Sequence, residues 1–417
     1  MPGHGDQLRG ALTEGVSEAL LHSLDVDRLA TELRHPPGRE ALLEGVLGER
    51  SVGVEISDDV ASLSHAFHRL DVPRFGADLV GQFEGRCNGY VVRVLEPGAV
   101  GLTLQSGRAR NAPDSDVRWT PDARMNVASV SKLITAMAAR KALADANVPA
   151  KTEIWPFLPL YWRRGPSLEK VTFEMLLTHQ SGFFNPTTSL ADFGELKAQV
   201  ARGALIGVPL GGATYQNVNF AMFRILIPVL TGAVNVTLTA PGGTEDDHDR
   251  LWDALTVQGY HDYVQQNVFA PAGVSGAATT SAPGNALAYK WPMPGAGWDS
   301  RDLSFTSATT GWHLTAHDVV HVLSAFTAGA VVPRKDAWAM LEAGWGIDRS
   351  GPTDAGPYFA KSGRWESESN QLEQAVAGWL PGGLPFAVLM NSQLGNDTPW
   401  LVDIIASTIA AHIVPIA

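Results

Sequence analysis

Hydrophobic side chains recur at the spacing of a helix over the first part of the chain. Between residues 9 and 48, apolar positions such as Leu12, Val16 and Leu20 form one stripe, which the segment 36–38 (Pro-Pro-Gly) interrupts. Residues 57–83 show similar spacing and predict one or two further helices. We therefore predict a helical extension over residues 1–85, in which no pattern indicates a chemical function.

From Gly89 onward the hydrophobic pattern changes to the two-residue period of strands. Residues 90–95 and 100–107 flank a Glu-Pro-Gly turn and predict a β-hairpin. Three more strands are predicted at residues 358–363, 373–380 and 386–391, with turns that favour an antiparallel meander. A mostly apolar helix over roughly residues 398–413 should pack against this sheet.

The middle of the chain has helical spacing and frequent prolines. Residues 171–183 predict a short amphipathic helix with Thr172 as its N-cap and Gly182 as its stop. Further helices are predicted from about residue 219 to residue 230, with Pro228 as a kink or early stop, near residues 248–258 and 260–269, and after Thr315. Strands on both sides of a helical middle indicate an α+β or mixed α/β core.

The composition of the 417-residue chain is ordinary for a globular enzyme. Hydrophobic residues make up 45% of the chain and charged residues 18%, which excludes wholesale disorder. The formal net charge of −12 and the absence of a basic run argue against a nucleic-acid partner. No stretch approaches the about 18 uninterrupted apolar residues of a membrane span, so we also predict no membrane partner.

Cysteine content and the N-terminal residues bear on the cellular compartment. Cys87 is the single cysteine, so the sequence permits neither an internal disulfide nor a cysteine metal cluster. Residues 1–7 have neither the basic nor the apolar region of a signal peptide. We therefore expect a cytoplasmic protein, and the sequence leaves its oligomeric state open.

The segment Ser129-x-x-Lys132 combines a hydroxyl and an amine at the start of a predicted helix. Leu133 and Met137 continue the helical spacing, which places Ser129 at or just inside the helix N-terminus. A hydroxyl there lies beside backbone N–H groups that have no intrahelical acceptor. An amine three residues later shares this face and can take the hydroxyl proton. The pattern predicts a nucleophile beside a base, although an N-cap serine followed by a solvated lysine would look the same.

Two other polar segments lie far from this serine in the sequence. Tyr215 and Asn217 stand on a bend that leads into a helix, where side chains can point into a cleft. Lys361, Ser362 and Gly363 end a predicted strand. Taken alone, the first segment would be ordinary turn chemistry.

Together and in this order, the three segments resemble the serine β-lactamase and penicillin-binding-protein superfamily. The closest resemblance is to its class C-like branch, which also includes carboxylesterases, D-amino-acid peptidases and acyltransferases. Residues 176–183 resemble that branch's Leu-Leu-Thr-His-x-Ser-Gly segment, and residues 309–318 resemble its entry into a late helix. The resemblance covers about residues 86–417.

The resemblance implies a mixed α/β (α+β) fold of the β-lactamase/transpeptidase-like type. In this fold an antiparallel sheet is flanked by helices and a mostly helical subdomain is inserted. The sheet subdomain would comprise residues 86–140 and 312–417, and the helical subdomain residues 141–311. The active site would lie between these two subdomains, and residues 1–85 would be an N-terminal helical extension.

Catalytic roles follow from the same resemblance. Ser129 would be the nucleophile, and it needs a base within hydrogen-bond reach. Lys132 can serve if burial and neighbouring cations lower its pKa. Tyr215 would carry the proton to the leaving group, and the roles of lysine and tyrosine can be shared because groups this close titrate as a set.

The resemblance also implies a set of substrate-binding groups. Asn217 would offer its amide to a substrate carbonyl, and Lys361 would hold a substrate carboxylate or depress the pKa of the tyrosine. The backbone N–H groups of the nucleophile and of Arg364 would form the oxyanion hole, and Gly363 would allow close approach. Ser362 stands where threonine is usual and keeps the hydroxyl. Bulky residues at 364–366 argue against penicillin-like substrates, whereas Lys361 favours a carboxylate-bearing or amide substrate.

We therefore predict a serine hydrolase that forms an acyl-enzyme on a small-molecule ester or amide, with no cofactor and no metal. An acyltransferase of secondary metabolism and a D,D-peptidase or β-lactamase use the same first step and stay open. A non-catalytic binding or sensor protein is a third class. A metal site on His313, His317 and His321, at successive i+4 positions, is a fourth. His179, in the last turn of its helix, is expected to pair with free carbonyls rather than to act in catalysis.

Overall fold

The computed structural model describes residues 67–96, 101–184, 191–206, 215–292, 294–396 and 399–416. Residues 1–66 of the predicted N-terminal extension lie outside this part. The described remainder of the extension consists mainly of strand β1 (His68–Leu70) and helix α6 (Val72–Phe83). The chain divides into two compact units, and the smaller one contains β1 in an antiparallel pair with β11 (Ile413–Pro415).

The larger unit is built on an antiparallel sheet. Its order is β4-β3-β2-β10-β9-β8-β7 among the described residues, with every pair antiparallel. The strands are β2 (Gly89–Val94), β3 (Leu102–Arg110), β4 (Val117–Arg118), β7 (Arg349–Gly351), β8 (Tyr358–Glu366), β9 (Leu372–Leu380) and β10 (Leu384–Met390). The sheet therefore joins the predicted hairpin to the predicted C-terminal meander, with β2 beside β10.

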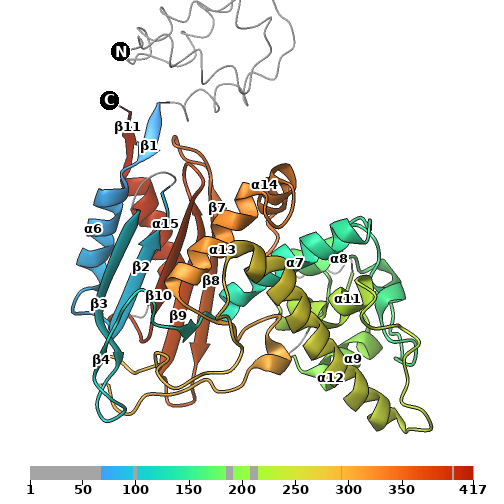
Figure 1. The fold of residues 1–417 in the computed structure, drawn as a ribbon. Helices are drawn as coiled ribbons and strands as arrows, with labels where there is room; N and C mark the ends of the chain where they lie inside the picture. Colours follow the sequence, from blue (N-terminus) through green and yellow to red (C-terminus); the bar gives the residue numbers. More distant parts are fainter. Residues whose placement is uncertain are drawn as a thin grey trace, which may run out of the picture. The chain divides into compact units, whose positions relative to one another are not determined.

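Helices cover both faces of this sheet. Every residue of the inner strand β9 is buried, which requires cover on each side. Helix α13 (Ala316–Ala328) packs on β10, β2 and β9, whereas α15 (Leu401–Ala411) packs on β9 and β8 and against α6 (Figure 1). The predicted C-terminal helix and its packing against the sheet are thus confirmed, with slightly shorter bounds.

A mostly helical region lies between the strands in the sequence and beside the sheet in space (Figure 1). Its central helix α7 (Ser131–Asp145) is buried at most positions. The other helices are α8 (Phe173–Leu177), α9 (Phe193–Arg202), α10 (Asn217–Ala221), α11 (Phe223–Leu230), α12 (Glu245–Val264) and, after α13, α14 (Arg334–Glu342). A short pair, β5 (Met125–Asn126) and β6 (His313–Leu314), ties the start of this region to its end.

Local capping agrees with the sequence patterns. The Thr172 hydroxyl accepts a hydrogen bond from the Met175 N–H at the start of α8, as predicted. Thr315 and Asp318 form a reciprocal capping box at the start of α13. Each of these two caps defines the residue at which its helix begins.

Two helix predictions differ from the structure. The pieces expected near residues 248–258 and 260–269 form one helix, α12, which continues into a π-helical turn at Gln265–Phe269. Gly259 lies within this helix at a close approach to α11. A Cβ at this position would stand 3.1 Å from Pro228 Cβ. Pro228 lies within α11, which ends at Leu230 as predicted, so the proline is not an early stop.

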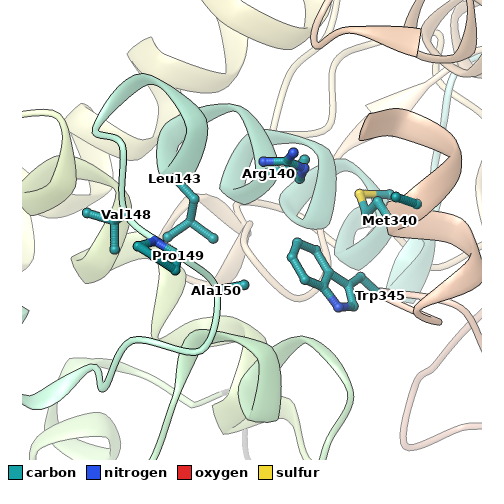
Figure 2. A pocket seen from close by; sticks show the side chains of 8 residues that line it. Arg140, Leu143, Val148, Pro149, Ala150, Met340 and Trp345 are labelled. Atoms are coloured by element: carbon teal, nitrogen blue, oxygen red, sulfur yellow. The ribbon is translucent and has the colours of Figure 1, made fainter. Parts of the chain in front are cut away.

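A pocket of about 300 Å³ lies beside the second half of α7. Figure 2 shows Arg140 and Leu143 of α7 facing Met340 of α14 and Trp345 across it. None of the predicted site residues lines this pocket. Among the described helices, none is long and apolar enough to cross a membrane.

Candidate active site

Ser129 lies in a single 3₁₀ turn, Ala128–Val130, directly before α7. The residue before it, Ala128, has a left-handed backbone with φ of 47°, a conformation that costs an alanine free energy. The side chain of Asn126 holds this turn, because its Oδ1 accepts the Ala128 N–H at 2.9 Å and the Gly311 N–H at 3.1 Å. The hydrogen bonds of Asn126 therefore stabilise the unfavourable backbone conformation that precedes Ser129.

Lys132 lies one turn beyond the serine with its side chain fully buried. Its Nζ is 2.9 Å from Ser129 Oγ and donates to the Thr309 carbonyl at 2.8 Å. Burial lowers the pKa of Lys132 below its ordinary value, and the charge of Lys361 lowers it further against an opposing effect of Tyr215. An amine with a lowered pKa at this distance can accept the serine proton.

Tyr215 meets the same serine oxygen from the other side of the site. Its hydroxyl donates to Ser129 Oγ at 2.9 Å. Desolvation would raise the pKa of Tyr215, but the ammonium groups of Lys132 and Lys361 outweigh it and lower this pKa. Their Nζ atoms lie 5.1 Å and 4.8 Å from the centre of the tyrosine ring. The structure thus brings Tyr215 and Lys361, which are distant in the sequence, to the neighbouring pair of Ser129 and Lys132.

His179 supports the tyrosine rather than the nucleophile. Its ring lies 4.5 Å from that of Tyr215, centre to centre. Its Nδ1 is 3.3 Å from the Gln216 N–H donor and 3.1 Å from the Asn219 amide nitrogen. Burial and the two lysine charges lower the pKa of His179 to about 3, so the ring is neutral. Its predicted pairing with carbonyls is therefore replaced by acceptance of hydrogen bonds from the segment after Tyr215.

Lys361 lies on β8 with its side chain almost fully buried. Its Nζ forms an ion pair with Asp348 Oδ1 at 2.5 Å. Burial alone would lower the pKa of Lys361, but the negative charges of Tyr215 and Asp348 raise it above the ordinary value. Lys361 therefore stays protonated beside the tyrosine. In this it differs from Lys132, whose pKa is lowered.

The edge of β8 approaches the nucleophile very closely at Gly363. A Cβ on this residue would stand 2.4 Å from the Val127 carbonyl oxygen and 3.0 Å from the Ser129 nitrogen, so only glycine fits. The Ser362 N–H lies on the edge of β8 that faces β7, where it donates a hydrogen bond to Asp348. N–H groups two residues apart in a strand share an edge, so that of Arg364 faces this edge as well. The backbone arrangement suits the predicted oxyanion donors, Ser129 and Arg364.

The remaining predicted binding residues lie around this centre. Asn217 is the first residue of α10, two positions after Tyr215, and is half-buried. The Ser362 hydroxyl donates to Asp348 Oδ2 at 2.6 Å. The guanidinium of Arg364 pairs with Glu366 and lies 5.7 Å from the Trp400 ring centre. The substrate contacts of these residues stay predictions.

Sequence reasoning missed two groups that the structure places here, Asp348 and Asn126. Asp348 precedes the edge strand β7 and reaches Lys361 only through the pairing of Arg349 with Ala360. Asn126 precedes the nucleophile by three residues, and its fixed role depends on Gly311 from a distant segment. Neither residue belongs to a motif. The sequence therefore shows only a polar residue near a motif in each case, which does not predict its role.

The histidine cluster considered from the sequence has a different geometry. The rings of His317 and His321 stack at 4.1 Å between centres on α13. His313 is buried elsewhere, with Nδ1 near the Gly311 carbonyl and Nε2 near the Ser300 hydroxyl. Within the described ranges, no group of three or more His, Cys, Asp or Glu side chains is arranged to hold a metal ion.

The chain was compared with protein-family profiles and with curated proteins. A family profile described as Beta-lactamase matches residues 71–247 of the chain. A search of curated proteins found none with significant similarity.

Solved structures resemble most of the chain. The class C beta-lactamase of Rhodobacter sphaeroides is 15% identical with a TM-score of 0.58, over 82% of this chain and 98% of that one. The D-amino acid amidase of Ochrobactrum anthropi SV3 is 17% identical with a TM-score of 0.55, over 82% and 96%. A D-stereospecific amidohydrolase of a Streptomyces species is 16% identical with a TM-score of 0.58, over 81% and 97%. The predicted β-lactamase-like mixed α/β fold is confirmed.

Proposed function

We propose that this chain, whose residues 71–247 match a family profile described as Beta-lactamase, is a serine hydrolase that cleaves a small ester or amide through an acyl-enzyme on Ser129. One observation carries the proposal. Ser129 Oγ lies 2.9 Å from both Lys132 Nζ and the Tyr215 hydroxyl, which is the geometry of an activated nucleophile. The lowered pKa of each partner makes its proton-accepting form more available than in an ordinary lysine or tyrosine.

The first half-reaction uses these groups in turn. The Ser129 proton passes to the Lys132 and Tyr215 set as Oγ bonds to the substrate carbonyl carbon. The resulting oxyanion is stabilised by the backbone N–H groups of Ser129 and Arg364. When the tetrahedral intermediate collapses, the Tyr215 hydroxyl protonates the leaving alcohol or amine, and the acyl group stays on the serine.

The second half-reaction runs through the same groups with water as the nucleophile. Water gives its proton to the lysine and tyrosine set and attacks the acyl carbon. Oγ then leaves, regains a proton and releases the carboxylic acid. Amide cleavage is supported by two similar structures, a D-amino acid amidase and a D-stereospecific amidohydrolase, both named for that reaction.

Intact-mass analysis tests the proposal directly. The protein is incubated with a fluorophosphonate, a penicillin and simple p-nitrophenyl esters, and the added mass is followed over time. We expect Ser129 to be labelled by the fluorophosphonate and to turn over the esters. Ser129→Ala should lose both, whereas the surface control Ser407→Ala on α15 should keep both.

Other outcomes separate the alternative functions. Stoichiometric acylation without turnover would indicate a binding or sensor protein instead of a hydrolase. An added alcohol or amine that accelerates release of the acyl group would identify an acyltransferase. Activity that chelators abolish and Ser129→Ala spares would refute the serine mechanism. The cytoplasmic location stays a prediction, which cell fractionation would check.

A further inference from the structure

An aspartate of the chain itself occupies the cationic end of the site. Asp348 lies just before β7 and its N–H donates to the Ala360 carbonyl, which places it opposite Lys361 on the neighbouring strand. Asp348 Oδ1 pairs with Lys361 Nζ at 2.5 Å. Its Oδ2 accepts the Ser362 N–H at 3.0 Å and the Ser362 hydroxyl at 2.6 Å.

These contacts engage the donors that would otherwise bind an anion. An ammonium group and a hydroxyl, aided by a backbone N–H, form a good receptor for one carboxylate. Here all three donate to the same aspartate. Lys361 is 1% exposed and Asp348 side chain 22% exposed, so the pair is shielded from solvent on the lysine side. The receptor is filled from within the protein.

The charge balance points in the same direction. Burial would raise the pKa of Asp348, but Lys361 and the Ser362 hydrogen bonds lower it, so the carboxylate is ionised at neutral pH. A substrate carboxylate arriving here would meet a second negative charge with its counter-ion already bound. Like charges brought together in a partly desolvated site repel strongly.

We propose that Asp348 determines specificity by standing in for a substrate carboxylate, so that the enzyme acts on esters or amides with no free carboxylate beside the scissile bond. This inference rests on the proposed hydrolase function. It replaces the expectation that Lys361 favours a carboxylate-bearing substrate. It also gives a structural reason, separate from the bulky residues at 364–366, why penicillins should be poor substrates.

The test compares two substrates that differ at one group, which is a carboxylate in one and its methyl ester in the other. One is m-carboxyphenyl phenylacetate, and the other is its methyl ester, m-(methoxycarbonyl)phenyl phenylacetate. A second pair, p-nitrophenyl hydrogen glutarate and its methyl ester, places the carboxylate on the acyl side. The rate without protein, which for the free glutarate includes attack of its own carboxylate, is subtracted first. The kcat/KM values are then divided by the rates of hydroxide-catalysed hydrolysis to correct for intrinsic reactivity.

For wild-type protein we expect the neutral member of at least one pair to be preferred by about tenfold or more. Asp348→Asn keeps the shape of the side chain and removes its charge, so this preference should fall by about tenfold. Asp403→Asn is the matched control, since Asp403 forms an ion pair with Arg349 on β7 and should leave the ratio unchanged.

Each result decides the question. Equal use of the two members in both pairs by wild-type protein overturns the inference without any variant, and so does an unchanged preference in a folded Asp348→Asn protein. If no ester is turned over and no reagent acylates Ser129, the proposed function itself fails. Turnover without charge preference leaves the hydrolase standing and removes only the role of Asp348.

Discussion

Glu373 provides a test of how the nucleophile's turn is held. It lies on β9 with only 2% of its surface exposed, and its Oε2 accepts the Asn126 amide N–H at 2.9 Å. Asn126 in turn holds the Ala128 N–H beside the nucleophile. Burial raises the pKa of Glu373 from 4.5 to about 8, against a smaller lowering by Asn126 and with a further increase from Asp299. The side chain is therefore a neutral acid at pH 7.

This raised pKa has a definite sign in stability. Below pH 4.5 the group is protonated in both the folded and the unfolded chain. As pH rises toward 8, the unfolded chain ionises while the folded chain must keep its proton, so stability is lost. At 1.36 kcal/mol per pH unit, the loss is about 1 kcal/mol at pH 5 and about 3 kcal/mol at pH 7.

Glutamine mimics the protonated side chain and cannot ionise. We therefore expect Glu373→Gln to be more stable than wild-type protein at pH 7, by up to about 3 kcal/mol, with a gain that grows steadily from pH 5 to pH 8. Thermal unfolding of the full chain, followed by near-UV circular dichroism at each pH, measures this trend. Ester hydrolysis at pH 7 should stay close to wild type because glutamine still accepts the Asn126 hydrogen bond.

The control and the refuting result are simple. Glu368→Gln removes an exposed carboxyl between β8 and β9 and should show no such gain with pH. A stability difference for Glu373→Gln that does not change between pH 5 and pH 8 would refute the reasoning. So would a variant that is less stable than wild type at pH 8, because the buried group would then gain from its charge.

Two further predictions concern the reaction. Gly363→Ala would force a Cβ against the Val127 carbonyl and the Ser129 nitrogen, so kcat/KM should fall about 100-fold or more in the ester assay; near-normal rates would contradict the close approach. The pH dependence of kcat/KM should rise as the Lys132 and Tyr215 set loses a proton, with a midpoint below the ordinary pKa of either group, since the net shift of each pKa is downward. A flat profile between about pH 5 and 9 would rule out this base.

Local sequence was enough for the elements whose signals are short in range. Thr172 and Thr315 cap their helices as expected, because a cap depends on a hydroxyl and an N–H within one turn. The spacing of Ser129 and Lys132 also defined their contact, since three residues on a helix set the two side chains on one face. The fold class followed from strand and helix periods together with the resemblance of the three motifs.

Charge at the site was decided by pairings between distant segments. The sequence around Lys361 does not indicate that Asp348 is its partner. The pairing of β7 with β8 brings the two side chains together. Glu373 reads as an ordinary polar strand residue until both faces of β9 are covered. Burial and neighbouring charges depend on what packs around a group, and hence only the folded chain determines its pKa.

The sequence alone determined which chemical groups are available: a hydroxyl, two amines and a phenol in motifs that resemble one superfamily. Tertiary structure decided their states, because it buried Lys132 beside a hydroxyl and a backbone carbonyl and paired Lys361 with a carboxylate. Covalent spacing and hydrogen-bonding type are local properties of the chain. Desolvation and Coulomb interactions act through space, so they arise only when distant segments meet.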